Sequence, residues 1–159
     1  MKCFNLAAVL FACVSVNLAQ PVAAADSHDH HHHEAAAAKL QLDHGRKWPT
    51  DAPLRQAMST MRADLAGKLH ALHKASLPKE DYVALGRSIE AQIGAIVSQC
   101  KLDSKADAML HIVIGDLAGA ADVMQGKADG NPAEAAHRAV VALNNYGRHF
   151  AHPGWAAIK

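Results

Sequence analysis

The chain has too few cysteines for a disulfide framework. It contains three, and Cys3 and Cys13 both fall in an N-terminal segment typical of a secretory signal peptide. Removal of that segment leaves Cys100 as a single thiol, which excludes an internal disulfide. A lone thiol in an oxidising compartment needs burial or a bound metal to protect it.

The sequence also lacks an excess of charge of either sign. Lysine and arginine total 16 and aspartate and glutamate total 15, and Lys2 is the only charged residue among the first 25. The rest of the chain is therefore neutral when histidine is uncharged. A neutral chain has no broad electrostatic attraction to nucleic acid or to anionic lipid, so we expect neither as a partner.

Residues 1–25 predict export. Lys2 provides a positive start, the run FNLAAVLFACVSVNLA is apolar, and Ala23 and Ala25 form an A-x-A cleavage site. The apolar run is shorter than the roughly 20 residues that a membrane-spanning helix needs, and no comparable run follows. We expect cleavage after Ala25 and a periplasmic protein without a membrane span. Lipidation at Cys13 is the alternative.

Four segments carry apolar residues at spacings of three and four, the pattern of amphipathic helices. The apolar stripes run from Leu54 to Leu72, from Tyr82 to Cys100, from Leu110 to Met124 and from Ala136 to Phe150. No segment alternates with a period of two, so strands are not expected. The pattern predicts an all-α protein, with an up-down-up-down antiparallel four-helix bundle over residues 40–159.

Local signals mark the helix starts and some close contacts. Asn131 followed by Pro132 predicts the start of the fourth helix, and Ser104 with Asp107 indicates a capping box for the third. Glycines inside the second and third runs weaken a helix, so we expect close backbone approach where they occur. These glycines are Gly86, Gly94, Gly115 and Gly119.

A His-rich segment, residues 26–39, precedes the predicted bundle and is expected to be a flexible arm. Its histidines are His28, His30, His31, His32 and His33. Neutral imidazole suits copper(II), nickel and zinc, so the composition indicates metal binding. A flexible arm imposes no geometry, and its affinities should follow the general order that peaks at copper. The alternative is a solvated polar tail that binds metals only as any polyhistidine does.

One end of the predicted bundle collects sulfur and imidazole side chains. The candidate ligands are Met58, Cys100, His111, His149 and His152. Thioether, thiolate and imidazole together suit copper(I). The hypothesis is a copper(I) site of Cys100, His149 and Met58, with His111 or His152 as a further ligand. The simpler alternative is that Met58 and Cys100 fill the core. The histidines His70, His73 and His137 are expected to be solvated.

Two short motifs resemble the cytochrome b562 type of small periplasmic bundle. They are LRQAMSTMRADL, at the head of the first helix, and YGRHF, near the end of the fourth. The resemblance implies haem b held by Met58 and His149, with Met61 and His152 as substitutes, and a role in electron transfer. The chain has no C-x-x-C-H motif, which sets it apart from the cytochrome c′ type. The chain also resembles small proteobacterial periplasmic proteins framed by GRKW and HPGW, a likeness that implies no activity.

Motifs of catalysis are missing from the sequence. It shows no nucleophile–base pairing, no glycine-rich phosphate loop, no H-E-x-x-H and no pair of carboxylates on a buried face, so we do not expect an enzyme. Three interpretations stay open: a metal-handling protein, with copper as the expected ion and a metal-trafficking or redox protein as partner; a b-type haem protein; and a helical interaction module without metal.

Overall fold

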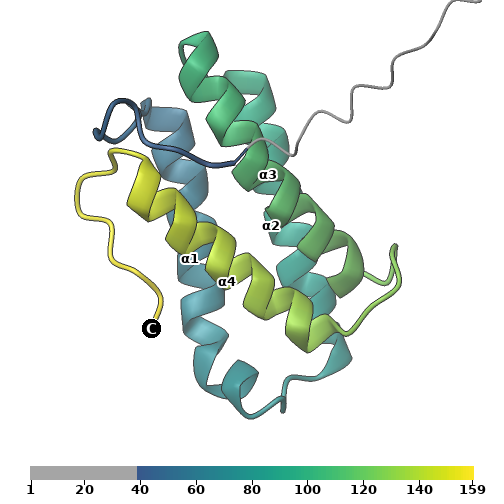
Figure 1. Ribbon diagram of the computed structural model, residues 1–159. Helices are drawn as coiled ribbons and strands as arrows, with labels where there is room; N and C mark the ends of the chain where they lie inside the picture. The colour runs from purple at the N-terminus through teal and green to yellow at the C-terminus, as the bar shows by residue number, and fades with distance from the viewer. Residues whose placement is uncertain (1–38) are drawn as a thin grey trace, which may run out of the picture. The chain divides into compact units, whose positions relative to one another are not determined.

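The computed structural model describes residues 39–159, which contain four α-helices and no strand (Figure 1). The helices are α1 (Ala52–His73), α2 (Lys79–Gln99), α3 (Ser104–Met124) and α4 (Pro132–His149). The prediction of an all-α fold built from four packed helices is confirmed. The predicted signal peptide and the histidines of the arm lie outside the described residues.

Side chains just before three of the helices satisfy their first backbone N–H groups. Asp51 Oδ1 accepts a hydrogen bond from the backbone N–H of Leu54 at 2.9 Å before α1. Asn131 Oδ1 accepts from Ala133 at 2.8 Å before α4, as predicted. The predicted cap of α3 is wrong, because Ser104 is already helical and Asp103 provides the cap. An aspartate carboxylate before a helix both accepts these hydrogen bonds and complements the positive end of the helix dipole.

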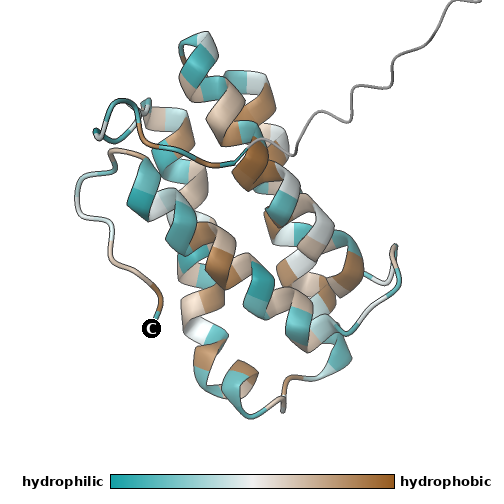
Figure 2. Ribbon diagram, viewed as in Figure 1, coloured by the Kyte–Doolittle hydropathy of each residue, from teal (hydrophilic) through white to brown (hydrophobic). Residues whose placement is uncertain are grey.

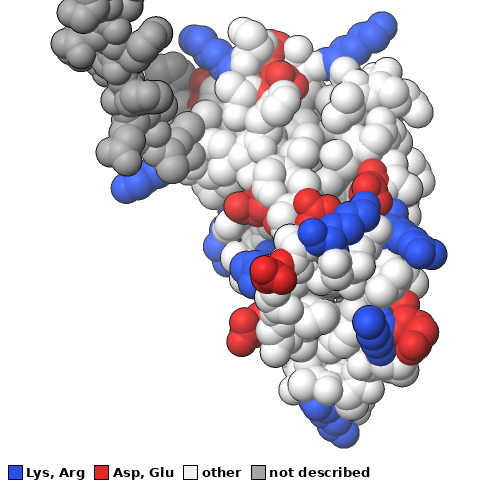
Figure 3. Space-filling view, turned by 90° about the vertical axis from the view of Figure 1, so that its right-hand side faces the viewer, with Lys and Arg blue, Asp and Glu red and all other residues white. Residues whose placement is uncertain are grey.

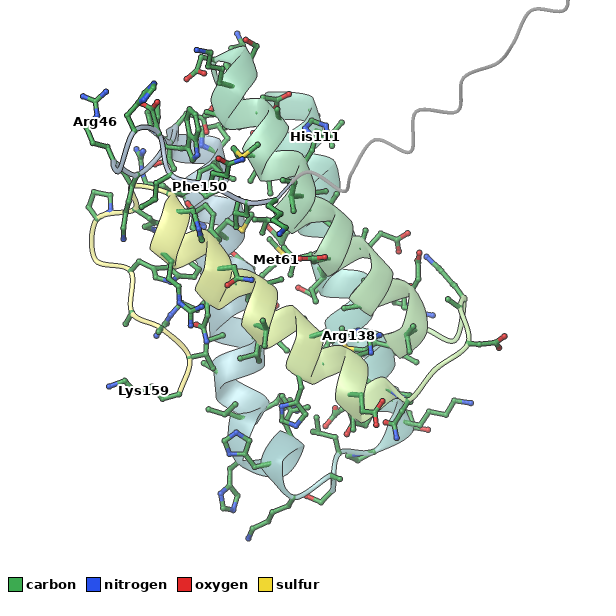
Figure 4. All side chains as sticks on the ribbon, in the orientation of Figure 1. Arg46, Met61, His111, Arg138, Phe150 and Lys159 are labelled. Carbon is green, nitrogen blue, oxygen red and sulfur yellow. The ribbon has the colours of Figure 1, made fainter. Side chains whose placement is uncertain are left out.

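The predicted apolar stripes form one core between the helices. Its largest side chains are almost wholly withdrawn from solvent: Leu54, Met58, Met61, Leu65, Leu72, Ile89, Leu110, Leu117, Met124, Leu143, Tyr146 and Phe150. Hydrophilic and hydrophobic positions recur along each helix (Figure 2), and Met61 and Phe150 lie among the helices while Arg46 and Lys159 point outward (Figure 4). Burial of each large apolar side chain stabilises the fold by about 1.5–3 kcal/mol before entropy is counted.

Each helix packs against the helices next to it in sequence, and α1 also packs against α4. The start of α1 lies beside the end of α2, because Asp51 Oδ2 accepts a hydrogen bond from the backbone N–H of Lys101 at 2.6 Å. The later part of α1 lies beside the start of α2, where Lys68 Nζ pairs with Asp81 Oδ2 at 3.0 Å. Helix ends that are far apart in sequence therefore share one end of the molecule.

Segments on both sides of the helices fasten onto the end of α4. The backbone N–H of Trp48 donates to the carbonyl of His149, and that of Ala151 donates to the carbonyl of Trp48, both at 2.8 Å. Near the C-terminus, the side chain of Asn144 exchanges two hydrogen bonds of 2.9 Å with the backbone of Ile158. The side chain of Trp48 is buried in the core, so it anchors the segment that precedes α1.

Only one of the four glycines noted in the sequence marks a close helix contact. A Cβ on Gly86 would lie 2.8 Å from the carbonyl oxygen of Ala121 on α3, whereas a Cβ on Gly94, Gly115 or Gly119 would meet nothing within 4 Å. The expectation for those three positions is wrong. Gly86 alone allows α2 and α3 their close approach, because no side chain separates the two backbones there.

Two matched substitutions on α2 test this contact. We expect Gly86→Ala to destabilise the protein by about 1–3 kcal/mol, because a backbone oxygen must move to admit the methyl group. Gly94→Ala, in open space on the same helix, should instead stabilise it by roughly 0.5–1 kcal/mol. Urea unfolding followed by circular dichroism measures both. Equal effects of the two changes would show that α2 and α3 do not depend on the missing side chain.

Candidate functional site at one end of the bundle

Three helix ends meet where the sequence places its candidate ligands. Asp51 stands at the start of α1, Cys100 directly follows α2, and Tyr146 lies in the last turn of α4. Asp51 Oδ1 lies 3.5 Å from Cys100 Sγ, in addition to its contacts with the backbone of Leu54 and Lys101. One carboxylate thus links the beginning of α1 to the end of α2.

The environment of Asp51 favours its charged form. Burial alone would raise the pKa of this carboxyl, but hydrogen bonds from the backbone of Lys101 and Leu54 and from the thiol of Cys100 outweigh it, so the pKa is lowered. A group whose pKa is lower in the folded chain gives stability that is present at neutral pH and is lost as acid protonates it. The link between α1 and α2 is therefore expected to weaken only in acid.

Burial, together with the same carboxylate, keeps Cys100 protonated. Burial, the hydrogen bond to Asp51 and the charge of Asp51 together raise the pKa of the Cys100 thiol to about 12. The thiolate is the form that attacks electrophiles and binds metals. At neutral pH the Cys100 side chain is thus a half-buried thiol that donates a weak hydrogen bond. Burial therefore gives this lone thiol one of the two kinds of protection that we expected it to need.

Alkylation of Cys100 measures this protection. At pH 8 we expect iodoacetamide to react with Cys100 at least about tenfold more slowly in the native protein than in urea, because both burial and the raised pKa reduce exposed thiolate. Asp51→Asn should speed the native reaction, since it removes the negative charge while keeping a side-chain oxygen for the helix cap. The matched variant Asp103→Asn, at the start of α3, should not. Equal rates in native and unfolded protein would contradict the burial of the thiol.

A chain of side-chain hydrogen bonds joins α1, α4 and the C-terminal segment. The hydroxyl of Tyr146 lies 3.0 Å from His152 Nδ1, and His152 Nε2 lies 3.3 Å from Ser59 Oγ. Burial raises the pKa of Tyr146, and burial followed by the charge of Arg55 lowers the pKa of His152. Both groups are therefore neutral at pH 7, with one nitrogen of the imidazole donating and the other accepting.

These hydrogen bonds include a contact between the hydroxyl of Ser59 and the imidazole of His152 that the sequence did not reveal. Ser59 and His152 are far apart in sequence and come together only because the C-terminal segment returns along α1. They line an open cavity of about 300 Å³ together with Arg55 and Gln56. A neutral imidazole beside a hydroxyl can exchange a proton with it, so the arrangement suits proton relay or hydrogen bonding to a small polar ligand.

The ring of Trp155 closes this end of the bundle. It packs edge-on against Tyr146 with centroids 5.0 Å apart, and Arg62 Cζ lies 5.9 Å from its centroid. A Cβ on Gly147 would overlap the indole, so this glycine is what admits the ring to the surface of α4. The indole Nε1 is buried and has no hydrogen-bond partner among residues 39–159.

The predicted ligands occupy different environments at this end. Met58 is fully buried in the core, and His149 is half-buried with Nδ1 2.8 Å from the carbonyl oxygen of Asn145. His111 is exposed, with Nδ1 2.9 Å from the carbonyl oxygen of Asp107 on its own helix. His152 is engaged by Tyr146 and Ser59.

Within residues 39–159, no group of three or more His, Cys, Asp or Glu side chains is placed to hold a metal ion. A copper(I) site of Cys100, His149 and Met58 contains only two such side chains, so it stays a prediction. Haem ligation by Met58 and His149 also stays a prediction. The burial of Met58 among core side chains fits the simpler expectation that this methionine fills the core.

The described surface carries charges of both signs without a large patch of one sign on the face drawn in Figure 3. One ion pair on this surface joins Lys127 Nζ to Glu90 Oε1 at 2.7 Å and so bridges two segments of the chain.

Among residues 39–159, no helix combines the length and the apolar character needed to cross a bilayer. Comparisons of the chain with protein-family models, with curated proteins and with solved structures give no match.

Proposed function

We propose that this chain is an exported metal-binding protein that collects copper(II), and more weakly zinc or nickel, through its His-rich segment. The observation that supports the proposal most is the density of imidazoles in that segment. Five of six consecutive residues, 28 and 30–33 with Asp29 between, are histidines, and Asp26 and Glu34 add carboxylates close by. Neighbouring histidines need no tertiary fold to bring their nitrogens to one ion.

The chemistry of such a segment determines what it binds and when. Its affinities follow the general order for nitrogen ligands, which peaks at copper(II). Metal release in acid follows as well, because imidazole must be neutral to ligate and an unperturbed histidine titrates near about 6.5. The protein is thus suited to buffering or delivering metal rather than to shaping its reactivity, and its partner would be a protein that exchanges the ion.

The four helices serve in this proposal as a stable carrier. The contacts between helix ends support an up-down-up-down order, with the candidate end formed by the start of α1 and the ends of α2 and α4. The raised pKa of the Cys100 thiol and the burial of Met58 favour structural roles for these side chains over copper(I) ligation. The burial of Met58 among core side chains also leaves the haem alternative with less support than metal binding by the His-rich segment.

Substitution of matched histidines tests the proposal. In the full chain, changing His31, His32 and His33 together to Asn should weaken copper(II) binding at least tenfold, about 1.4 kcal/mol, in competition with a chelator of known affinity. The control changes three histidines that the described structure shows as exposed, His44, His70 and His111, and should leave this affinity unchanged. Neither triple variant should alter the unfolding free energy without metal by more than about 0.5 kcal/mol. Equal losses in both variants would contradict the assignment to the segment.

The proposal also requires export. We expect the protein recovered from the periplasm of cells that produce the full chain to begin at Asp26 or within a few residues of it, because the A-x-A site ends at Ala25. Intact-mass measurement of that protein checks the processing. A protein that retains Met1, or one that carries a lipid on Cys13, would contradict it.

A further inference from the structure

Two histidines that are remote in sequence face each other at the end of the bundle away from Asp51. His73 is the last residue of α1, and His137 lies in the second turn of α4. Their ring centroids are 5.9 Å apart and their planes are nearly parallel, 6° from one another. Packing of α1 against α4 brings the rings together, which the sequence pattern did not predict.

The spacing of the two rings suits ligation of one ion. A zinc ion lies about 2 Å from each ligating imidazole nitrogen, and that nitrogen lies about 1 Å out from its ring centroid, so two rings on one tetrahedral ion have centroids about 5 Å apart, and at most about 6 Å when the nitrogens lie on opposite sides of the ion. The 5.9 Å between His73 and His137 lies at that upper limit, and the nearly parallel rings must turn before both can ligate one ion. The χ2 torsion of histidine is broad, so rotation of the exposed rings can direct one nitrogen of each toward a common point.

Both rings are accessible and uncommitted. They are exposed, and neither has a hydrogen-bond partner among residues 39–159. His137 also lines an open groove of about 560 Å³ between α3 and α4, together with Asp116 and Arg138. Solvent can therefore reach an ion held between the two histidines. No third His, Cys, Asp or Glu completes the pair in this part of the chain, so water would fill the remaining positions.

We propose that His73 and His137 form an interhelical site for a divalent transition-metal ion of the zinc, nickel or copper(II) type. The site joins the end of α1 to the start of α4. It differs in kind from the His-rich segment, because its two ligands adjoin only in the folded protein. Binding there stabilises the native state by mass action, whereas ions on neighbouring histidines of residues 28–33 bind folded and unfolded chains alike.

Thermal unfolding of the full chain with and without zinc tests the site. Zinc at saturating concentration should raise Tm by at least about 3 °C. The rise should vanish in His73→Ala and in His137→Ala, both of which alter exposed side chains and leave the metal-free Tm nearly unchanged. The matched variant His111→Ala, exposed on α3, should keep the full rise. Circular dichroism of each variant without metal checks that it remains folded.

The ring signals of the two histidines provide a second, independent readout. In an NMR spectrum that detects imidazole nitrogens, zinc should shift the signals of His73 and His137 together, with one dissociation constant. The proposal is overturned if zinc leaves Tm unchanged, if the rise survives either substitution, or if His111→Ala removes it. If residues 28–33 were found not to bind copper(II), only the proposed function would be contradicted. The site of His73 and His137 would be unaffected, because the measurements that test it do not depend on that segment.

Discussion

The carboxylate of Asp51 is the constraint on which one end of this molecule depends. Its two oxygens accept hydrogen bonds from the first turn of α1, from the backbone just beyond α2 and from the thiol of Cys100. A helix cap is usually a local device, because it satisfies donors of its own helix. Here the same group also satisfies a donor about fifty residues away, so the start of one helix and the end of the next are fixed by a single charge.

The fold could be predicted from the sequence because its causes are local. The spacing of Leu54, Met58, Met61 and Leu65 specifies a buried helix face wherever the partner lies, and the structure buries all four. Errors arose where the answer depended on neighbours in space. Gly86 and Gly94 look alike in the sequence, yet only Gly86 lies against another backbone. The choice between Asp103 and Ser104 as a cap depended on a one-residue difference in where the chain turns helical.

The candidate site was only partly predictable for the same reason. Contacts within residues 39–159 do bring Cys100 and the end of α4 close to the start of α1, through Asp51 and through the segment that precedes it. Nothing in the sequence indicated that Ser59 would meet His152, because that pair depends on the path of the chain after α4. Nothing indicated either that His73 would meet His137, because that pair depends on how α1 and α4 are rotated about their own axes. The sequence also gave no sign that burial and the neighbouring Asp51 would together raise the pKa of the Cys100 thiol.

The position of the two tryptophans determines what intrinsic fluorescence can report. The chain contains only Trp48 and Trp155, and both lie against the last turns of α4. Emission from this protein is therefore a local probe of the end where the flanking segments are fastened, while far-ultraviolet circular dichroism averages over all four helices. If the loop between α1 and α2 or the start of α4 opens first on heating, the dichroic signal falls while the emission stays native. The two tryptophans of the chain thus report on one end of the helices only.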